Sequence, residues 1–245
     1  MLKFRFLQAS FLFLLFMGCA SDETMPEPEE EQPIGEFLDD WTFSVFPDPT
    51  YSNFEIGQFR LWVPEDPVDL KAVLVLLTSS NGNALGLANS TEWQTYAENE
   101  RLALCSINFK SLSSGNYAQA GSGSGQALMD AIELIAMANG IPKISDLPFL
   151  LRGYSAGGNF SYSFSSFKPE KVVGLVSIRA GQLEMTSTNA SVPGLILTGE
   201  REGEQRNEFL REIALDKRKV GGLWSFAIEP NATHFTNLKA SDDLA

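Results

Sequence analysis

The sequence predicts an α/β fold, with a doubly wound, mostly parallel sheet that begins with antiparallel N-terminal strands. Strand-like and helix-like segments alternate along most of the chain, as expected for right-handed crossovers between parallel strands. The run AVLVLL at 72–77 is continuously apolar, which is typical of a strand buried on both faces of a parallel sheet. At 245 residues and 44% hydrophobic content, the chain can bury one sizeable core.

The individual elements follow in chain order. WTFSVF at 41–46 and GQFRLWVP at 57–64 alternate apolar and polar residues, which predicts two antiparallel strands before AVLVLL. Within 121–140 the apolar spacing predicts a helix, with Ser124 as its N-cap and Gly140 as its end. The other expected elements are a helix at 91–101, strands at 102–108, 148–153, 172–178, 193–199 and 222–230, and helices at 156–167 and 204–219.

The N-terminal region predicts export from the cytoplasm. A basic start and an apolar run give residues 1–18 the character of a signal peptide, and Cys19 follows as in a bacterial lipoprotein signal, where this cysteine is lipidated. Residues 19–35 are acidic and Pro-rich, so we expect a disordered tether to the membrane and a domain at 36–245 that is short at its C-terminus. The alternatives are a secretory signal or an uncleaved anchor; the domain faces either the periplasm or the cell exterior.

Composition excludes several classes of function. A formal charge of −13 with no basic patch argues against nucleic acid as a partner. One histidine and two cysteines, Cys19 and Cys105, give no metal site, and we expect no cofactor. Cys105 lies in an apolar strand-like run and is expected to be a buried thiol.

Ser155 is the candidate nucleophile. In PFLLRGYSAGG the pattern Gly153-x-Ser155-x-Gly157 stands between a predicted strand and a predicted helix, where side chains two residues from the serine would collide in a tight turn. This is the place of the nucleophile in α/β-hydrolases. The alternative is an ordinary serine in a glycine-rich turn. Serine needs a base for activation, and His234, the one histidine, follows the last predicted strand.

An acidic residue that orients the histidine should lie between Ser155 and His234 in the sequence. The segment LTGEREGEQ supplies Glu200, Glu202 and Glu204, which are also the acids that a helix N-terminus favours. Here the chain resembles the α/β-hydrolase family, in which the corresponding strand is often followed by Gly-x-x-Asp. The resemblance covers about 72–235 and implies that Glu202 is the acid, with Glu200 as the alternative.

The same resemblance implies an oxyanion hole and a minimal fold with no large cap. One donor would be the N–H of Ala156, and the second would come from the loop TSSNGN, at Ser79, Ser80 or Asn81. Tyr117 and Tyr154 are candidates for the lining of the cleft. The segments NYAQAGSGSGQALMDAI, GYSAGGNFSYSFSSFKPEKVV and EPNATHF are similar to secreted hydrolases related to polyhydroxybutyrate depolymerases and feruloyl esterases.

These features together predict a serine hydrolase that cleaves carboxylic esters, either small molecules or acyl groups on polysaccharides. The membrane is the second expected partner, through Cys19. Two alternatives stay open. An acyltransferase would use the same residues with an alcohol in place of water, and a binding lipoprotein on this fold would bind a ligand without turnover.

Overall fold

The computed structural model describes residues 34–48, 52–67, 69–185 and 188–244. Their strands are β1 (Gly35–Asp39), β2 (Thr42–Val45), β3 (Phe54–Trp62), β4 (Ala72–Leu77), β5 (Leu102–Ser111), β6 (Phe149–Tyr154), β7 (Val172–Ile178), β8 (Gly194–Gly199) and β9 (Trp224–Glu229). In these ranges they form a nine-stranded sheet in the order β1-β2-β3-β5-β4-β6-β7-β8-β9. The pairs from β1 to β5 are antiparallel, and those from β5 through β4 to β9 are parallel. The predicted fold class is confirmed.

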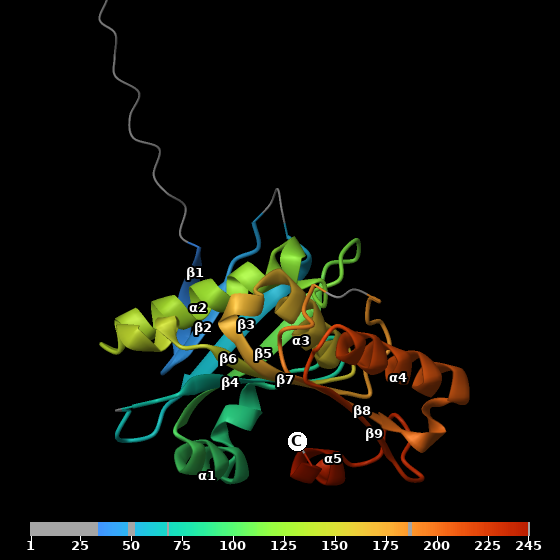
Figure 1. Cartoon of the computed structure of the whole chain (residues 1–245). Helices are drawn as coiled ribbons and strands as arrows, with labels where there is room; N and C mark the ends of the chain where they lie inside the picture. Colours follow the sequence, from blue (N-terminus) through green and yellow to red (C-terminus); the bar gives the residue numbers. More distant parts are fainter. Residues whose placement is uncertain (1–33, 49–51, 68, 186–187, 245) are drawn as a thin grey trace, which may run out of the picture. The chain divides into compact units, whose positions relative to one another are not determined.

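Helices cover both faces of this sheet. The α-helices are α1 (Thr91–Glu100), α2 (Ser124–Ala138), α3 (Ala156–Phe167), α4 (Glu204–Lys219) and α5 (Lys239–Leu244). The 3₁₀ turns are η1 (Leu85–Asn89), η2 (Ala120–Ser122), η3 (Pro142–Asp146), η4 (Pro169–Lys171) and η5 (Glu200–Glu202). Figure 1 shows α2, α3 and α4 on one face and α1 and α5 on the other. Among the described helices, none combines the length and apolar character that a membrane span requires.

The core forms on both faces of the central strand β4. Every residue of β4 is buried. Val73 and Val75 belong to the larger apolar cluster, whereas Leu74 and Leu76 pack with α1 on the opposite face. Because side chains alternate across a strand, a strand covered on both faces has no polar side. The continuous apolar run was therefore correctly interpreted.

Several local predictions differ from the structure. β1 and α5 were not predicted, because each is short and largely exposed and carries little apolar periodicity. Gly123, not Ser124, is the N-cap residue of α2, and the Ser124 hydroxyl donates to Tyr117 O at 2.6 Å. Cys105 is a buried free thiol, as expected. The predicted signal peptide, Cys19 and the tether up to residue 33 lie outside the described residues.

The side chain of Lys217, near the end of α4, is a buried cation. Lys217 is 2% exposed, donates to Asn189 Oδ1, and lies 5.3 Å and 5.8 Å from the ring centroids of Tyr162 and Trp224. Desolvation by burial lowers the pKa of Lys217 from 10.5 to about 8. The folded chain therefore releases this proton at a lower pH than the unfolded chain does.

This difference predicts a pH dependence of stability. Between about pH 8 and about pH 10 the unfolded state binds more protons than the folded state at Lys217, so this group makes the free energy of unfolding increase with pH. The buried Cys105 thiol, whose pKa burial raises, opposes this increase above about pH 9. In denaturant unfolding across this window, the slope of the free energy of unfolding against pH should be more positive in the wild type and in Lys143→Met, an exposed control, than in Lys217→Met. Equal slopes for the wild type and Lys217→Met would contradict the expectation.

Candidate active site

A tight turn presents Ser155 between β6 and α3. Ser155 has φ 56° and ψ −117°, a backbone conformation that is unfavourable for residues with a side chain. A Cβ on Gly153 would lie 2.0 Å from Gly157 O, and one on Gly157 would lie 2.7 Å from Thr78 O. The two glycines of the motif are therefore required by the close approach of backbone segments around the serine.

The glycine requirement gives a direct prediction. Gly153→Ala places a methyl group inside backbone van der Waals distance, so we expect a loss in the free energy of unfolding of more than about 4 kcal/mol, or failure to fold. Gly86→Ala is the matched control, because nothing lies within 4 Å of its added Cβ. Thermal or denaturant unfolding of both variants checks this; similar stabilities for the two would contradict the geometry of the turn.

His234 lies against Ser155. It follows β9, and its Nε2 is 3.0 Å from Ser155 Oγ. Its Nδ1 is 3.0 Å from Glu202 Oε1 and 3.2 Å from Oε2. Because a carboxylate only accepts hydrogen bonds, this contact favours a proton on Nδ1 and leaves Nε2 to accept the serine hydroxyl. The serine, the imidazole and the carboxylate thus form one continuous hydrogen-bonded chain.

Glu202 is the acid that reaches the histidine. It ends η5, directly after β8, and its side chain is 1% exposed. Arg206, one turn further into α4, forms an ion pair with Glu202 Oε2 at 2.7 Å. Glu200, the alternative in the sequence, instead accepts a hydrogen bond from Asn231 N at 2.7 Å. The geometry therefore places Glu202 beside the imidazole and Glu200 in support of the loop that precedes His234.

Two further side chains, those of Tyr154 and Arg179, donate hydrogen bonds to the backbone at His234. The Tyr154 hydroxyl donates to His234 O at 2.6 Å. Burial raises the pKa of Tyr154, so this hydroxyl remains a donor. Arg179, with a fully buried side chain, donates to His234 O at 3.3 Å and to Thr236 O, and pairs with Glu229 Oε2 at 2.6 Å. Tyr154, named from the sequence as a cleft residue, thus also anchors the loop.

Sequence reasoning did not find the two arginines. Arg206 joins the site by its ion pair with Glu202 and by donating to Arg179 O at 2.5 Å. The short spacing of four residues between Glu202 and Arg206 was the available signal, although Glu202 ends η5 and is separated from α4 by Gly203, with φ 105°. Arg179 had no such local signal, because the partners of its side chain lie at least 50 residues further along the chain.

The loop after β4 lies beside the start of α3. Gly157 N donates to Thr78 O at 3.0 Å, and Gly82 N donates to Ser79 O at 2.9 Å, which closes the loop on itself. Ser80 and Asn81 are exposed, and Asn81 Oδ1 accepts from Ser111 N at 2.9 Å. The N–H of Ala156 is at the first position of α3, where backbone N–H groups have no acceptor within the helix.

Of the three candidates for the second donor, Ser79 is next in the chain to Thr78 and is half-buried, whereas Ser80 and Asn81 are exposed. Tyr117 lies beneath the loop. It is 3% exposed, its ring stacks on Phe109, and its hydroxyl is 3.4 Å from Ser79 O. Burial raises the pKa of Tyr117 to about 12. The structure thus places Tyr117 in the core as a support for the loop.

No family model and no curated protein matches the chain. Solved structures do match. A thermostable esterase has a TM-score of 0.56 at 16% identity, over 78% of this chain and 55% of that one. Thermogutta terrifontis esterase 2, phosphorylated by paraoxon, has a TM-score of 0.56 at 14% identity, over 87% of this chain and 92% of the esterase chain. Poly(aspartic acid) hydrolase-1 from Sphingomonas sp. KT-1 has a TM-score of 0.54 at 15% identity, over 80% of this chain and 94% of the hydrolase chain.

These likenesses show the fold. The chain has the α/β-hydrolase fold, with a mixed sheet that begins with antiparallel strands, and the solved structures that it resembles include esterases. The chain spans 55% of the length of the thermostable esterase. Within the described ranges, no group of three or more His, Cys, Asp or Glu side chains is arranged to hold a metal ion.

Proposed function

We propose that this protein is a serine hydrolase that cleaves carboxylic esters through an acyl-enzyme. The observation that carries the proposal is the hydrogen-bonded chain from Ser155 through His234 to the buried Glu202, at 3.0 Å for each contact. A nucleophile, a base and an orienting acid in this order are the components of acyl transfer on this fold. The solved structures with the same fold include esterases, which favours an ester over other acyl compounds.

The chemistry follows from the contacts. Ser155 Oγ attacks the ester carbonyl carbon while His234 Nε2 takes the hydroxyl proton, and Glu202 stabilises the imidazolium that forms. The carbonyl oxygen, now an oxyanion, accepts hydrogen bonds from the Ala156 N–H and from the loop at Ser79. His234 then donates its proton to the leaving alcohol. Water, deprotonated by the same imidazole, attacks the acyl-enzyme and releases the acid and the free serine.

We further propose that the protein is anchored through Cys19 to a bacterial membrane outside the cytoplasm, and that its substrates include acyl groups on polysaccharides. The support is sequence alone: the apolar run before Cys19, the acidic tether, and the segments similar to secreted polyhydroxybutyrate depolymerases and feruloyl esterases. Cys19→Ala should move the protein from the membrane fraction to the soluble fraction. Unchanged membrane association of this variant would contradict the lipid anchor.

The test of the proposed reaction is product analysis with p-nitrophenyl esters of increasing acyl length. Release of the free acid, unchanged by added alcohols, supports a hydrolase. Transfer of the acyl group to an added alcohol identifies an acyltransferase instead. If a folded full-length chain gives no turnover of any ester while it binds them, the protein is a binding lipoprotein on this fold.

A further inference from the structure

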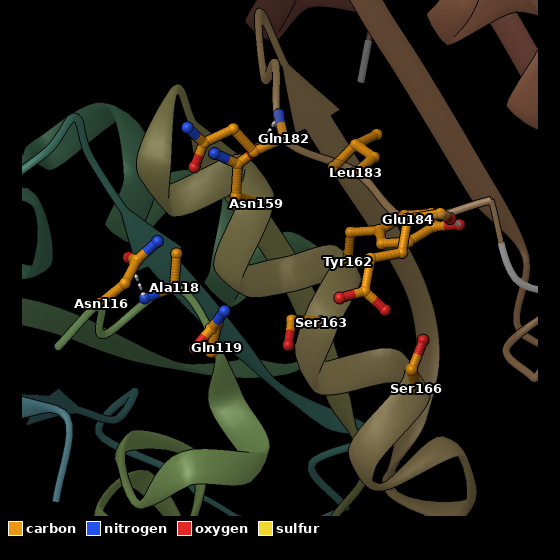
Figure 2. Close-up of a pocket in the computed structure, with 10 residues that line it drawn as sticks. All are labelled: Asn116, Ala118, Gln119, Asn159, Tyr162, Ser163, Ser166, Gln182, Leu183 and Glu184. Carbon is orange, nitrogen blue, oxygen red and sulfur yellow. Dashed lines mark hydrogen bonds between the residues drawn. The ribbon is translucent and has the colours of Figure 1, made fainter.

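A polar groove runs along α3, away from the nucleophile. It has a volume of about 320 Å³, which is at the lower end of small-molecule sites. We call it the α3 groove, and Figure 2 shows its lining. Its walls are α3, the segment 116–119 before η2, and the segment 182–184 after β7. Its polar lining side chains are Asn116, Gln119, Asn159, Tyr162, Ser163, Ser166, Gln182 and Glu184.

The α3 groove is related to the active site by the helix itself. Asn159, Ser163 and Ser166 line the groove from one side of α3, at spacings of four and three residues. Counting back four residues from Asn159 on the same side gives Ser155. With a rise of about 1.5 Å per residue, the groove extends from roughly 6 Å to roughly 16 Å beyond the nucleophile along the helix axis. This is the distance range of a substrate group that is remote from the reacting bond.

The groove has hydrogen-bonding groups left to use. Ser166 Oγ is buried and, among the described residues, has no hydrogen-bond partner. A helical serine usually donates to the carbonyl four residues earlier, but Tyr162 O already accepts from Ser165 Oγ at 2.7 Å and from Asn189 Nδ2 at 3.4 Å. A buried hydroxyl without a hydrogen-bond partner destabilises the folded state. Because Ser166 lines the groove, rotation of its side chain toward a bound ligand would give the hydroxyl a partner and remove that destabilisation.

Two other lining side chains, those of Asn159 and Ser163, use only part of their hydrogen-bonding capacity. Asn159 Oδ1 accepts from Gly181 N and Gln182 N at 3.2 Å and 3.0 Å, which occupies its oxygen and leaves its amide nitrogen as a donor. Ser163 Oγ accepts from Ala120 N at 3.0 Å, which leaves its proton to donate. Figure 2 shows these amides and hydroxyls around one space. An acyl chain in that space would leave the polar groups without partners, so a ligand with its own donors and acceptors fits better.

The charges of the lining residues further limit which class of ligand the groove can bind. Among the described residues that line it, none is Lys or Arg, and the one ionisable acid is the exposed Glu184. A phosphate or carboxylate would meet no cation among the lining residues and would face the like charge of Glu184. Lys217, 5.3 Å from the ring of Tyr162, is buried and donates to Asn189. Hydroxyl groups, which both donate and accept, match the amides and serines without any charge.

We propose that the α3 groove binds a neutral saccharide, the part of an ester substrate that carries the acyl group. The role of this site in ester turnover rests on the proposed esterase function, but saccharide binding by the groove does not. The acyl ester would lie at Ser155, and the sugar units beyond it would occupy the groove next to Asn159, Ser163 and Ser166.

The binding test uses full-length Ser155→Ala protein in detergent and needs no turnover. Titration with xylotriose or cellotriose, followed by calorimetry or NMR, should give saturable binding at millimolar concentrations, and trigalacturonate should bind more weakly because of Glu184. Adding Ser166→Leu, which fills the groove, should abolish saccharide binding, whereas Gln126→Ala on the exposed side of α2 should not. Ser166→Ala should weaken binding without loss of folding stability, since it removes an unpaired hydroxyl.

The activity test compares two acetyl esters. The ratio of kcat/KM for acetylated xylotriose to kcat/KM for p-nitrophenyl acetate should fall about tenfold or more in Ser166→Leu and stay constant in Gln126→Ala. Saccharide binding without ester turnover would overturn the proposed function and keep the site. Absence of saccharide binding to a folded protein, binding unaffected by Ser166→Leu, or stronger binding of trigalacturonate would overturn the inference while ester turnover stands.

Discussion

Ser155→Ala should lower kcat for ester hydrolysis by at least about 10⁴-fold, because the acyl-enzyme cannot form without the hydroxyl that lies 3.0 Å from His234 Nε2. The substitution removes one oxygen and keeps the backbone, so the free energy of unfolding should change little. The strained φ of 56° is unaffected, since alanine and serine both carry a Cβ.

The measurement is steady-state hydrolysis of p-nitrophenyl acetate beside denaturant unfolding of the same preparations. Ser145→Ala, in η3, is the matched control for serine removal, because the Ser145 hydroxyl only donates to the nearby Pro142 O at 2.7 Å, and it should retain turnover of this ester within about twofold. Residual activity of Ser155→Ala within tenfold of the wild type would show that another residue carries the reaction.

Glu202→Gln should lower kcat by about 10³- to 10⁴-fold. The carboxylate accepts from two donors at once, His234 Nδ1 at 3.0 Å and Arg206 Nη1 at 2.7 Å. A glutamine side chain has only one oxygen, so one of these donors would face the amide NH₂. If that donor is His234, the imidazole rotates or takes the other tautomer, and Nε2 can no longer accept the serine proton.

Glu200→Gln is the matched control, because it makes the same chemical change two residues earlier. Glu200 accepts one hydrogen bond, from Asn231 N at 2.7 Å, and an amide oxygen can replace that acceptor. Its kcat should stay within about twofold of the wild type. A larger loss in Glu200→Gln than in Glu202→Gln would assign the acid to Glu200 and contradict the contact between Glu202 and His234.

Eight of the nine strands in the described sheet, and the turn that holds Ser155, could be predicted from the sequence. β4 could be predicted because burial on both faces removes polar residues from the whole strand, and the Gly153-x-Ser155-x-Gly157 pattern could be placed because strand and helix signals flank it. These signals are local, and each depends on residues within one element or one turn.

What the sequence could not supply depends on contacts between distant segments. The choice between Glu200 and Glu202 depends on where the loop after β9 meets η5, and the roles of Arg206 and Arg179 depend on carbonyls and carboxylates from other elements. Tyr117 was a candidate for the cleft because it stands just before the glycine-rich start of a predicted helix, yet packing on Phe109 places it in the core. β1 and α5 were missed because short exposed elements carry little apolar pattern.

Covalent labelling of the full-length protein with a fluorophosphonate tests the central claim most directly, because the probe reacts only with an activated serine. Intact mass and peptide mapping should show one adduct at Ser155 in the wild type, and no adduct in Ser155→Ala or His234→Ala. Absence of labelling in a folded wild-type protein, or an adduct at another serine that persists in Ser155→Ala, would contradict the assignment of Ser155 as the nucleophile.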